Sequence, residues 1–438
     1  MIISFKKPFY FLLLLSVILK KSIQSHVVYP FKKSRKEKKV YPEDIIQNDL
    51  EITIEIGTPP QKIDLNLRNS EFTFFVTSIR ANLPYTTFNE TNSKSYIKLV
   101  NNSSFNKKEY KMAEKISESI IINNKKIDNI TLILATSLVY KESGALGLKL
   151  VLNRVGSDDL SFIYQMKNKS NFDNYTFTLK YDDNNDEKGE LIIGSYPHIY
   201  DSQNYQENSF IHHSAGKIDN MIDWVFDFQE IKYDNKTINE IIKKSLFKIE
   251  YGLIQAPLEL KKFFNDTFFL GKCNETLYSE RNIYIITCDK RFDIATFKDL
   301  KFVLKDIEYE FVLTYKELFI EKDNKYIFAI AFDNNIYTDK DSYWILGKPF
   351  MKKYQLVFDL DNKFIGIYKN NKGNKDDKDN ENSKEDDKNN FNILIPILII
   401  LSVIIIGLII FIIYYVRKQR RNKAYELNDD NFDYSPSQ

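Results

Sequence analysis

A hairpin pattern near the start of the chain limits the possible folds more than any other feature of this sequence. Apolar and polar residues alternate over 51–56, the turn sequence Gly-Thr-Pro-Pro follows at 57–60, and apolar residues alternate again at 63, 65 and 67. A period of two places successive side chains on opposite faces of a strand, so the pattern predicts a half-buried antiparallel hairpin. A further apolar run at 72–76 predicts a third strand.

Strand-like segments separated by polar turns continue through most of the remaining sequence. In the second half they include 283–287, 300–304, 309–313 and 326–332. Two short segments, 162–166 and 258–264, favour helix instead. The sequence therefore predicts an all-β protein with few helices.

Size and charge set broad limits on function. The chain has 438 residues, which is enough for two lobes with appendages, and 14% of them are aromatic, which supplies a large core. Its formal net charge of +2 provides no field that would favour nucleic acid. Of the four histidines, His26, His198, His212 and His213, only the last two are adjacent, and neighbours on a strand face opposite ways. We expect no metal site and no cofactor.

The first 25 residues have the features of a secretory signal peptide. Lys6 and Lys7 precede the apolar run 9–19, and small and polar residues follow as far as Ser25. A short membrane anchor is the alternative, but the apolar run is too short to span a bilayer comfortably.

A second apolar segment, 393–416, contains no charged residue. At about 1.5 Å per residue a helix of this length exceeds the roughly 30 Å hydrocarbon core, so it predicts a transmembrane helix rather than a buried soluble one. The basic residues that follow at once favour the cytosolic side: Arg417, Lys418, Arg420, Arg421 and Lys423. The expected topology is single-pass type I, with a luminal or extracellular ectodomain and a cytosolic tail. The membrane could be that of the secretory pathway, the cell surface, an endosome or another organelle.

Composition divides the rest of the chain. Residues 26–44 are rich in basic side chains, and we expect either a pro-like segment or a solvated linker. Residues 370–391 are almost wholly Asn, Lys, Asp and Glu, which predicts a disordered stalk. The expected parts are a signal peptide (1–25), the basic segment (26–44), two β-rich lobes (45–215 and 216–369), the stalk (370–391), the transmembrane helix (393–416) and the tail (417–438).

In an exported ectodomain, cysteines can form disulfides and asparagines can be glycosylated. Cys273 and Cys288 are the only cysteines, and such a close pair in an oxidising compartment predicts a disulfide. N-glycosylation sequences, all on the predicted luminal side, begin at Asn89, Asn101, Asn102, Asn129, Asn168, Asn174, Asn235, Asn265 and Asn274.

Four sequence features together resemble the pepsin-like aspartic protease family, over about 50–368. They are IGTPPQK at 56–62, FNETNSKSY at 88–96, the cysteine pair, and WILGKPFMKKYQLVFDLDNKFIGIYK at 344–369. Gly144-Ala145-Leu146-Gly147 is also echoed by Trp344-Ile345-Leu346-Gly347, as in a fold where each lobe threads such a strand beside its catalytic turn. The resemblance implies a bilobal pepsin-like fold of two six-stranded-type β-barrel lobes around a central cleft, in which Cys273 and Cys288 match the disulfide of the second lobe.

The two turns that carry the family's catalytic aspartates look altered. Arg68 occupies the first aspartate position and is followed by Asn69 and Ser70 instead of Thr-Gly. In the second lobe an ungapped count back from Pro257 gives Lys248, whereas a gapped alignment gives Glu250. A guanidinium cannot deprotonate a water molecule, because it stays charged. The resemblance therefore implies no catalytic residue at these positions.

The glycine-bearing flap of the family is also reduced, since its likeliest remnant, Tyr110, is followed by Lys-Met-Ala. We therefore expect a glycosylated type I membrane pseudoprotease whose cleft binds a peptide or protein partner. Two alternatives remain: a membrane-anchored endopeptidase with a non-standard dyad, for which Glu250 with Asp64 is the pair available, and a structural or adhesive surface glycoprotein.

Overall fold

The structure is a computed structural model that describes residues 26–34, 41–84, 86–101, 110–122, 124–138, 142–150, 160–169, 172, 174–218, 221–239, 243–333 and 343–369. The predicted signal peptide, stalk, transmembrane helix and cytosolic tail lie outside these residues and stay predictions. Among the described residues, no helix has the length and apolar character needed to cross a bilayer.

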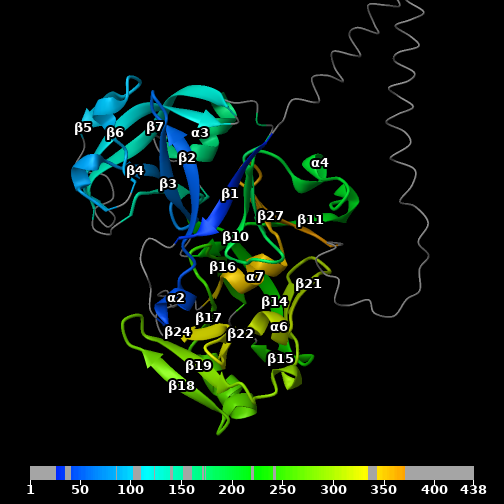
Figure 1. Ribbon diagram of the computed structural model, residues 1–438. Helices are drawn as coiled ribbons and strands as arrows, with labels where there is room; N and C mark the ends of the chain where they lie inside the picture. Colours follow the sequence, from blue (N-terminus) through cyan, green and yellow to red (C-terminus); the bar gives the residue numbers. More distant parts are fainter. Residues whose placement is uncertain are drawn as a thin grey trace, which may run out of the picture. The chain divides into compact units, whose positions relative to one another are not determined.

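Strands dominate the described part of the chain (Figure 1). Those of the first half are β1 (Val27–Lys33), β2 (Leu50–Ile56), β3 (Gln61–Arg68), β4 (Phe74–Thr77), β5 (Ile97–Asn101), β6 (Tyr110–Ile122), β7 (Lys125–Leu138), β8 (Gly144–Gly147), β9 (Thr176–Tyr181), β10 (Lys188–Ile193) and β11 (Phe210–Ser214). The helices are short: α2 (Glu43–Ile46), α3 (Phe162–Lys169), α4 (Pro197–Tyr200), α5 (Glu259–Phe264), α6 (Tyr315–Leu318) and α7 (Lys348–Lys353).

The second half adds the remaining strands. They are β12 (Lys217–Ile218), β13 (Met221–Ile222), β14 (Val225–Tyr233), β15 (Lys236–Asn239), β16 (Lys244–Phe247), β17 (Ile254–Pro257), β18 (Cys273–Tyr278), β19 (Ile283–Asp289), β20 (Leu300–Leu304), β21 (Glu310–Leu313), β22 (Phe319–Lys322), β23 (Lys325–Phe328), β24 (Ile330–Asp333), β25 (Trp344–Leu346), β26 (Val357–Asp359) and β27 (Phe364–Tyr368).

The described strands form two large sheets. The first has the order β11-β27-β26-β9-β10-β1-β2-β3-β8-β4-β7-β6-β5, and an added β2–β6 pairing closes part of it into a barrel. The second has the order β21-β20-β14-β16-β25-β17-β24-β19-β23-β22, with β15 beside β14 and β18 beside β19. The fold is mostly β, as the alternation predicts.

Several local predictions are confirmed. β2 and β3 form the predicted antiparallel hairpin, in register from Glu51 opposite Asn66 to Ile56 opposite Gln61. Residues 162–169 and 259–264 are helical, close to the two helical segments expected. Cys273 and Cys288 are opposite each other in the β18–β19 hairpin and form the predicted disulfide. The expected strand 326–332 is interrupted at Ala329, so that β23 and β24 pair with different parts of β19.

The basic segment assigned to 26–44 has more structure than a solvated linker. Its first part is β1, which pairs antiparallel with both β10 and β2 (Figure 1, deep blue). Val27, Tyr29 and Phe31 are buried on β1, because alternate side chains of a strand share a face. This strand is therefore an integral part of the first sheet.

The last two strands join the halves of the chain. β26 pairs with β9, and β27 pairs with β11, so the sequence after residue 356 completes the sheet that contains β1 and β10. The boundary expected between 215 and 216 therefore does not separate the two sheets. Aromatic side chains fill the interior here, with Phe177 stacked on Phe358 and Trp224 packed against both.

The first prediction concerns β1. Phe31 is 2% exposed and contacts the ring of Tyr181, and its own ring fills the space over Gly189. Phe31→Ala should lower the free energy of unfolding by about 3–5 kcal/mol, because it leaves a cavity in the sheet. Chemical denaturation would measure this. Ile199→Ala removes an apolar side chain that is 52% exposed, and is the control. An equal effect of both variants would show that β1 does not contribute to the core.

Candidate functional site

Two turns, one from each half of the chain, meet at the site that sequence analysis singled out. The first follows β3 and comprises Arg68, Asn69, Ser70 and Glu71; the second follows β16 and comprises Lys248, Ile249 and Glu250. We call these seven residues the turn junction. Both turns leave strands that pair in parallel with a short apolar strand, β8 in one half and β25 in the other.

A glycine at the end of each apolar strand lets the chain pass closely. A Cβ atom on Gly147 would lie 2.5 Å from the backbone nitrogen of Thr73, and one on Gly347 would lie 2.3 Å from the carbonyl oxygen of Leu253. Side chains do not fit at such distances, so glycine is required at both positions. The similar segments 144–147 and 344–347 therefore have the same role in their halves: each ends in a glycine that lets the backbone pass closely beside a turn.

Asn69 connects the two turns directly. Its side-chain amide donates to the carbonyl oxygen of Phe247 over 2.9 Å, and its side-chain oxygen accepts from the backbone N–H of Ile249, also over 2.9 Å. Asn69 is fully buried. Lys248 lies between the two residues that Asn69 holds, so the Asn69 amide fixes the backbone on both sides of Lys248.

Ser70 and Glu250 form a second link. The backbone N–H of Ser70 donates to Glu250 Oε1 over 3.0 Å, and the Ser70 hydroxyl donates to the same oxygen. The Glu250 carboxylate is therefore tied to the first turn. Asn48 holds the backbone of the second turn from the other side. Its backbone N–H donates to the carbonyl oxygen of Glu250, and its side-chain amide donates to the carbonyl oxygen of Ile249.

Arg68 is held by two carboxylates. Nη1 lies 3.1 Å from Glu71 Oε1, and Nη2 lies 2.6 Å from Glu142 Oε2, which also accepts from the side-chain amide of Asn66. The side chain of Arg68 is 23% exposed, that of Glu71 is 15% exposed and that of Glu142 only 4%. The guanidinium is thus largely enclosed and already neutralised by its neighbours.

Glu142 was not identified from the sequence. It comes from the chain just before β8, far from Arg68 in sequence, and reaches it because Asn66 and Ala145 are paired between β3 and β8. The spacing between Glu142 and the Gly144–Gly147 strand was a usable signal, since that strand was expected beside the first turn.

Lys248 differs from Arg68. Its side chain is half-buried, and within the described residues neither a hydrogen bond nor an ion pair holds its amino group. Its backbone N–H donates to the carbonyl oxygen of Leu346 over 3.2 Å, which continues the pairing of β16 with β25. Lys248 therefore brings a cation without a fixed partner to the turn junction.

Burial and neighbouring charges alter the pKa values here. Burial raises the pKa of Glu142, the nearby Arg68 partly opposes this, and Glu71 and Asp49 add to it by repulsion. Burial alone would lower the pKa of Arg68, but Glu142 and Glu71 reverse the direction and raise it. Arg68 consequently stays charged, and Glu142 is the group that binds a proton more readily than usual.

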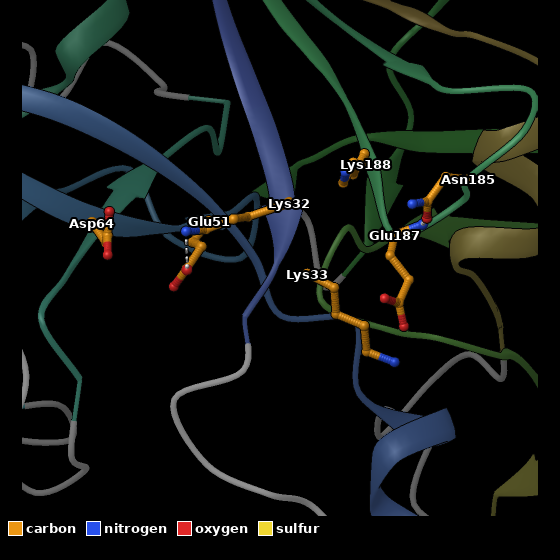
Figure 2. A pocket seen from close by; sticks show the side chains of 7 residues that line it. All are labelled: Lys32, Lys33, Glu51, Asp64, Asn185, Glu187 and Lys188. Atoms are coloured by element: carbon orange, nitrogen blue, oxygen red, sulfur yellow. Dashed lines mark hydrogen bonds and ion pairs between the residues drawn. The ribbon is translucent and has the colours of Figure 1, made fainter.

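The alternative acid pair expected from the sequence, Glu250 with Asp64, is not brought together. Asp64 lies on β3 four residues before Arg68, about 13 Å along the strand at roughly 3.3 Å per residue, and accepts from Thr53. It belongs instead to a surface pocket of mixed charge (Figure 2). This pocket is lined by residues from four strands and from the chain just before β10: Lys32, Lys33, Glu51, Asp64, Asn185, Glu187 and Lys188.

Other expected site residues are placed as follows. Tyr110 begins β6, opposite Leu138 of β7, and its side chain lies outside the described residues. His212 packs on Phe364, whereas His213 packs on Phe226. Within the part of the chain that the structure describes, no group of histidine, cysteine and acidic side chains is arranged to hold a metal ion.

The glycosylation sequences can be compared with exposure. Seven acceptor asparagines have described side chains, and all of these are exposed or half-buried: Asn89, Asn129, Asn168, Asn174, Asn235, Asn265 and Asn274. The side chains of Asn101 and Asn102 lie outside the described residues. Glycosylation at all nine stays a prediction.

The Asn69 contacts generate a prediction. Asn69→Ala would leave the carbonyl of Phe247 and the N–H of Ile249 buried without partners, which should cost about 2–5 kcal/mol of the free energy of unfolding. Urea denaturation would measure the loss. Asn184→Ala, in an exposed turn, should change stability by about 0.5 kcal/mol at most. Comparable stabilities for the two variants would rule out a structural role for the Asn69 amide.

A second prediction concerns acid. Because the pKa of Glu142 is raised in the folded protein, its contribution to stability is unfavourable at neutral pH and improves as the pH falls towards its usual value of 4.5. Glu142→Gln should therefore stabilise the protein at pH 7, and this advantage should shrink as the pH falls towards 4.5. Thermal unfolding of both proteins between pH 4.5 and 7.5 tests the sign. A constant difference would show that Glu142 does not titrate in this range.

The comparisons with known proteins agree with the fold. The family model described as eukaryotic aspartyl protease matches residues 51–370, which is most of the chain. No curated protein sequence matches this chain. The matched region includes both turns, the β18–β19 disulfide hairpin and the strands that join the two halves. The chain therefore belongs to the eukaryotic aspartyl protease family and contains its pepsin-like domain.

Proposed function

We propose that this protein is a pseudoprotease: a pepsin-like domain that binds a peptide or protein partner without cleaving it. The bridge made by Asn69 carries the proposal. Its contacts with Phe247 and Ile249, on either side of Lys248, support Lys248 as the counterpart of Arg68 and hence the ungapped alignment over Glu250. Peptide hydrolysis of this type needs two carboxylates close enough to share a proton and activate a water molecule.

The charges at the turn junction support the loss of that chemistry. Arg68 does not act as a base, since its guanidinium stays charged, and Lys248 supplies no carboxylate. Among the described residues, the carboxylates of Glu71 and Glu142 bind Arg68 and that of Glu250 binds Ser70, and none of the three hydrogen-bonds to another. Among these three described carboxylates, no pair is therefore arranged to share a proton.

The proposed setting follows from the sequence. A cleaved signal peptide and a transmembrane helix at 393–416 would hold the domain on the luminal or outer face of a secretory, surface or endosomal membrane. There the partner would meet the domain at high local concentration. The disulfide is consistent with an oxidising compartment.

Cleavage is the first test of this proposal. The full-length glycosylated protein in detergent should show no pepstatin-sensitive cleavage of a peptide library between about pH 3 and 7. Circular dichroism and an intact disulfide should establish that the sample is folded. Pepstatin-sensitive cleavage would identify a working endopeptidase, and Glu250→Gln would then show whether that carboxylate is one of its acids.

Partner capture is the second test. Photo-crosslinking from the turn junction in cells should trap a partner, and the double variant Arg68→Ala with Lys248→Ala should reduce its yield about tenfold or more, as expected for the loss of two charges in a binding site. The exposed pair Glu55 and Lys62, each changed to Ala, is the matched control. If both double variants capture the partner equally, the protein does not bind through this site, and a structural or adhesive surface role becomes the better explanation.

A further inference from the structure

The turn junction and Glu142 contain more negative charge than their hydrogen bonds use. Arg68 faces Glu71 and Glu142 directly and also lies within the electrostatic reach of Glu250. One guanidinium therefore meets three carboxylates, and Lys248 offsets at most one of the two excess charges. A buried carboxylate without a compensating charge is costly, so the site favours any change that removes negative charge.

Negative charge can be removed at three carboxylate oxygens. Glu71 Oε2, Glu142 Oε1 and Glu250 Oε2 are buried, and in the described part of the chain each lacks a hydrogen-bond partner. The other oxygen of each group accepts a bond, so the side chains are fixed in place. Because these three oxygens are closed to solvent, an ammonium group or a metal ion has no direct access to them. A proton is small enough to reach them.

Glu142 is the best placed of the three to take up this proton. It is the most buried of them, and the charged groups around it are Arg68, Glu71 and Asp49, of which two are acidic. Burial and these two carboxylates raise the pKa of Glu142 above its usual value, while Arg68 and Asn66 oppose the rise. Proton uptake converts the carboxylate to a neutral carboxylic acid and breaks no covalent bond.

Protonation also changes what Arg68 can bind. A guanidinium attracts a carboxylate more strongly than a neutral carboxylic acid, so a neutral Glu142 competes less for Nη2 of Arg68. The same proton removes one unit of negative charge from the surroundings of Lys248, whose amino group lacks a fixed partner among the described residues. Both changes favour an anion at the turn junction.

We propose that the turn junction is a proton-gated binding site for acidic peptides. At neutral pH the carboxylates of Glu71 and Glu142 occupy Arg68 and repel anions. In acid, Glu142 becomes neutral, and Arg68 with Lys248 receives an acidic side chain of the ligand. This inference rests on the proposed partner-binding function and adds the charge of the partner and the condition for its capture.

The test uses a fluorescent peptide that carries sulfotyrosines, because a sulfate keeps its charge over the pH range and only the protein then titrates. Binding to the full-length protein in detergent is measured by anisotropy at pH 7.5 and pH 5. The affinity should rise about tenfold in acid, the factor that one unit charge at roughly 10 Å supplies at an effective dielectric of about 20. A peptide with unmodified tyrosines is the ligand control.

Glu142→Gln keeps the shape of the side chain and removes its charge. This variant should bind the sulfated peptide at pH 7.5 about as tightly as the natural protein does at pH 5, and its affinity should change little with pH. Arg68→Gln should bind weakly at both pH values. Glu55→Gln removes a carboxylate from an exposed pair on β2 and should behave as the natural protein does.

The outcomes separate the proton gate and the charge preference from the partner-binding function. Equal binding by the natural protein at both pH values overturns the gate and leaves the partner-binding function standing, and this result does not depend on whether any variant folds. Tight binding of the unmodified peptide in place of the sulfated one overturns the charge preference. Failure of the sulfated peptide to bind at either pH overturns the anion site, whereas the partner-binding function is judged separately by crosslinking in cells.

Discussion

The bridge from Asn69 to the second turn is the contact on which the arrangement of the candidate site depends. One buried amide satisfies a carbonyl and an N–H two residues apart, and so fixes the backbone on both sides of Lys248. Without it, two polar backbone groups would be buried without partners at the meeting point of the two halves. Ser70 with Glu250 repeats the connection beside it, so the two turns hold each other in place.

The bridge can form only because the surrounding sheet brings the two turns together. β26 and β27 lie at the end of the described chain, yet they pair with β9 and β11 of the first half, while β1 lies between β10 and β2. Gly147 and Gly347 then let each turn pass close to its neighbouring backbone. Most strand pairing and aromatic packing lies elsewhere, so the charged side chains at the turns can differ while the fold is kept. Function in such a family therefore has to be argued from the site and not from the fold.

The charges at the site explain why a scaffold of this family could serve binding instead of hydrolysis. Hydrolysis needs two carboxylates that share a proton, whereas here Glu71 and Glu142 bind different nitrogens of Arg68. The same arrangement leaves an excess of negative charge that a proton can remove. Under the proposed function, such a site would respond to pH through its affinity for a ligand and not through a reaction rate.

The sequence by itself determined the local structure. Alternation over 51–56 and 63–67, on either side of a Gly-Thr-Pro-Pro turn, was sufficient to predict the β2–β3 hairpin. The close cysteine pair was sufficient to predict the disulfide, because both features depend on residues near each other in the chain. The resemblance also led to the prediction that Arg68 stands at the first catalytic position. Only the tertiary structure decided what surrounds Arg68, since Glu142 reaches it through the pairing of β3 with β8. The incorporation of β1 into the sheet could not be predicted either, because Tyr29 and Phe31 stand in a segment whose basic charge suggested exposure. Strand pairing over long distances leaves no local pattern, and so the partners of a charged residue are settled only when the sheet forms.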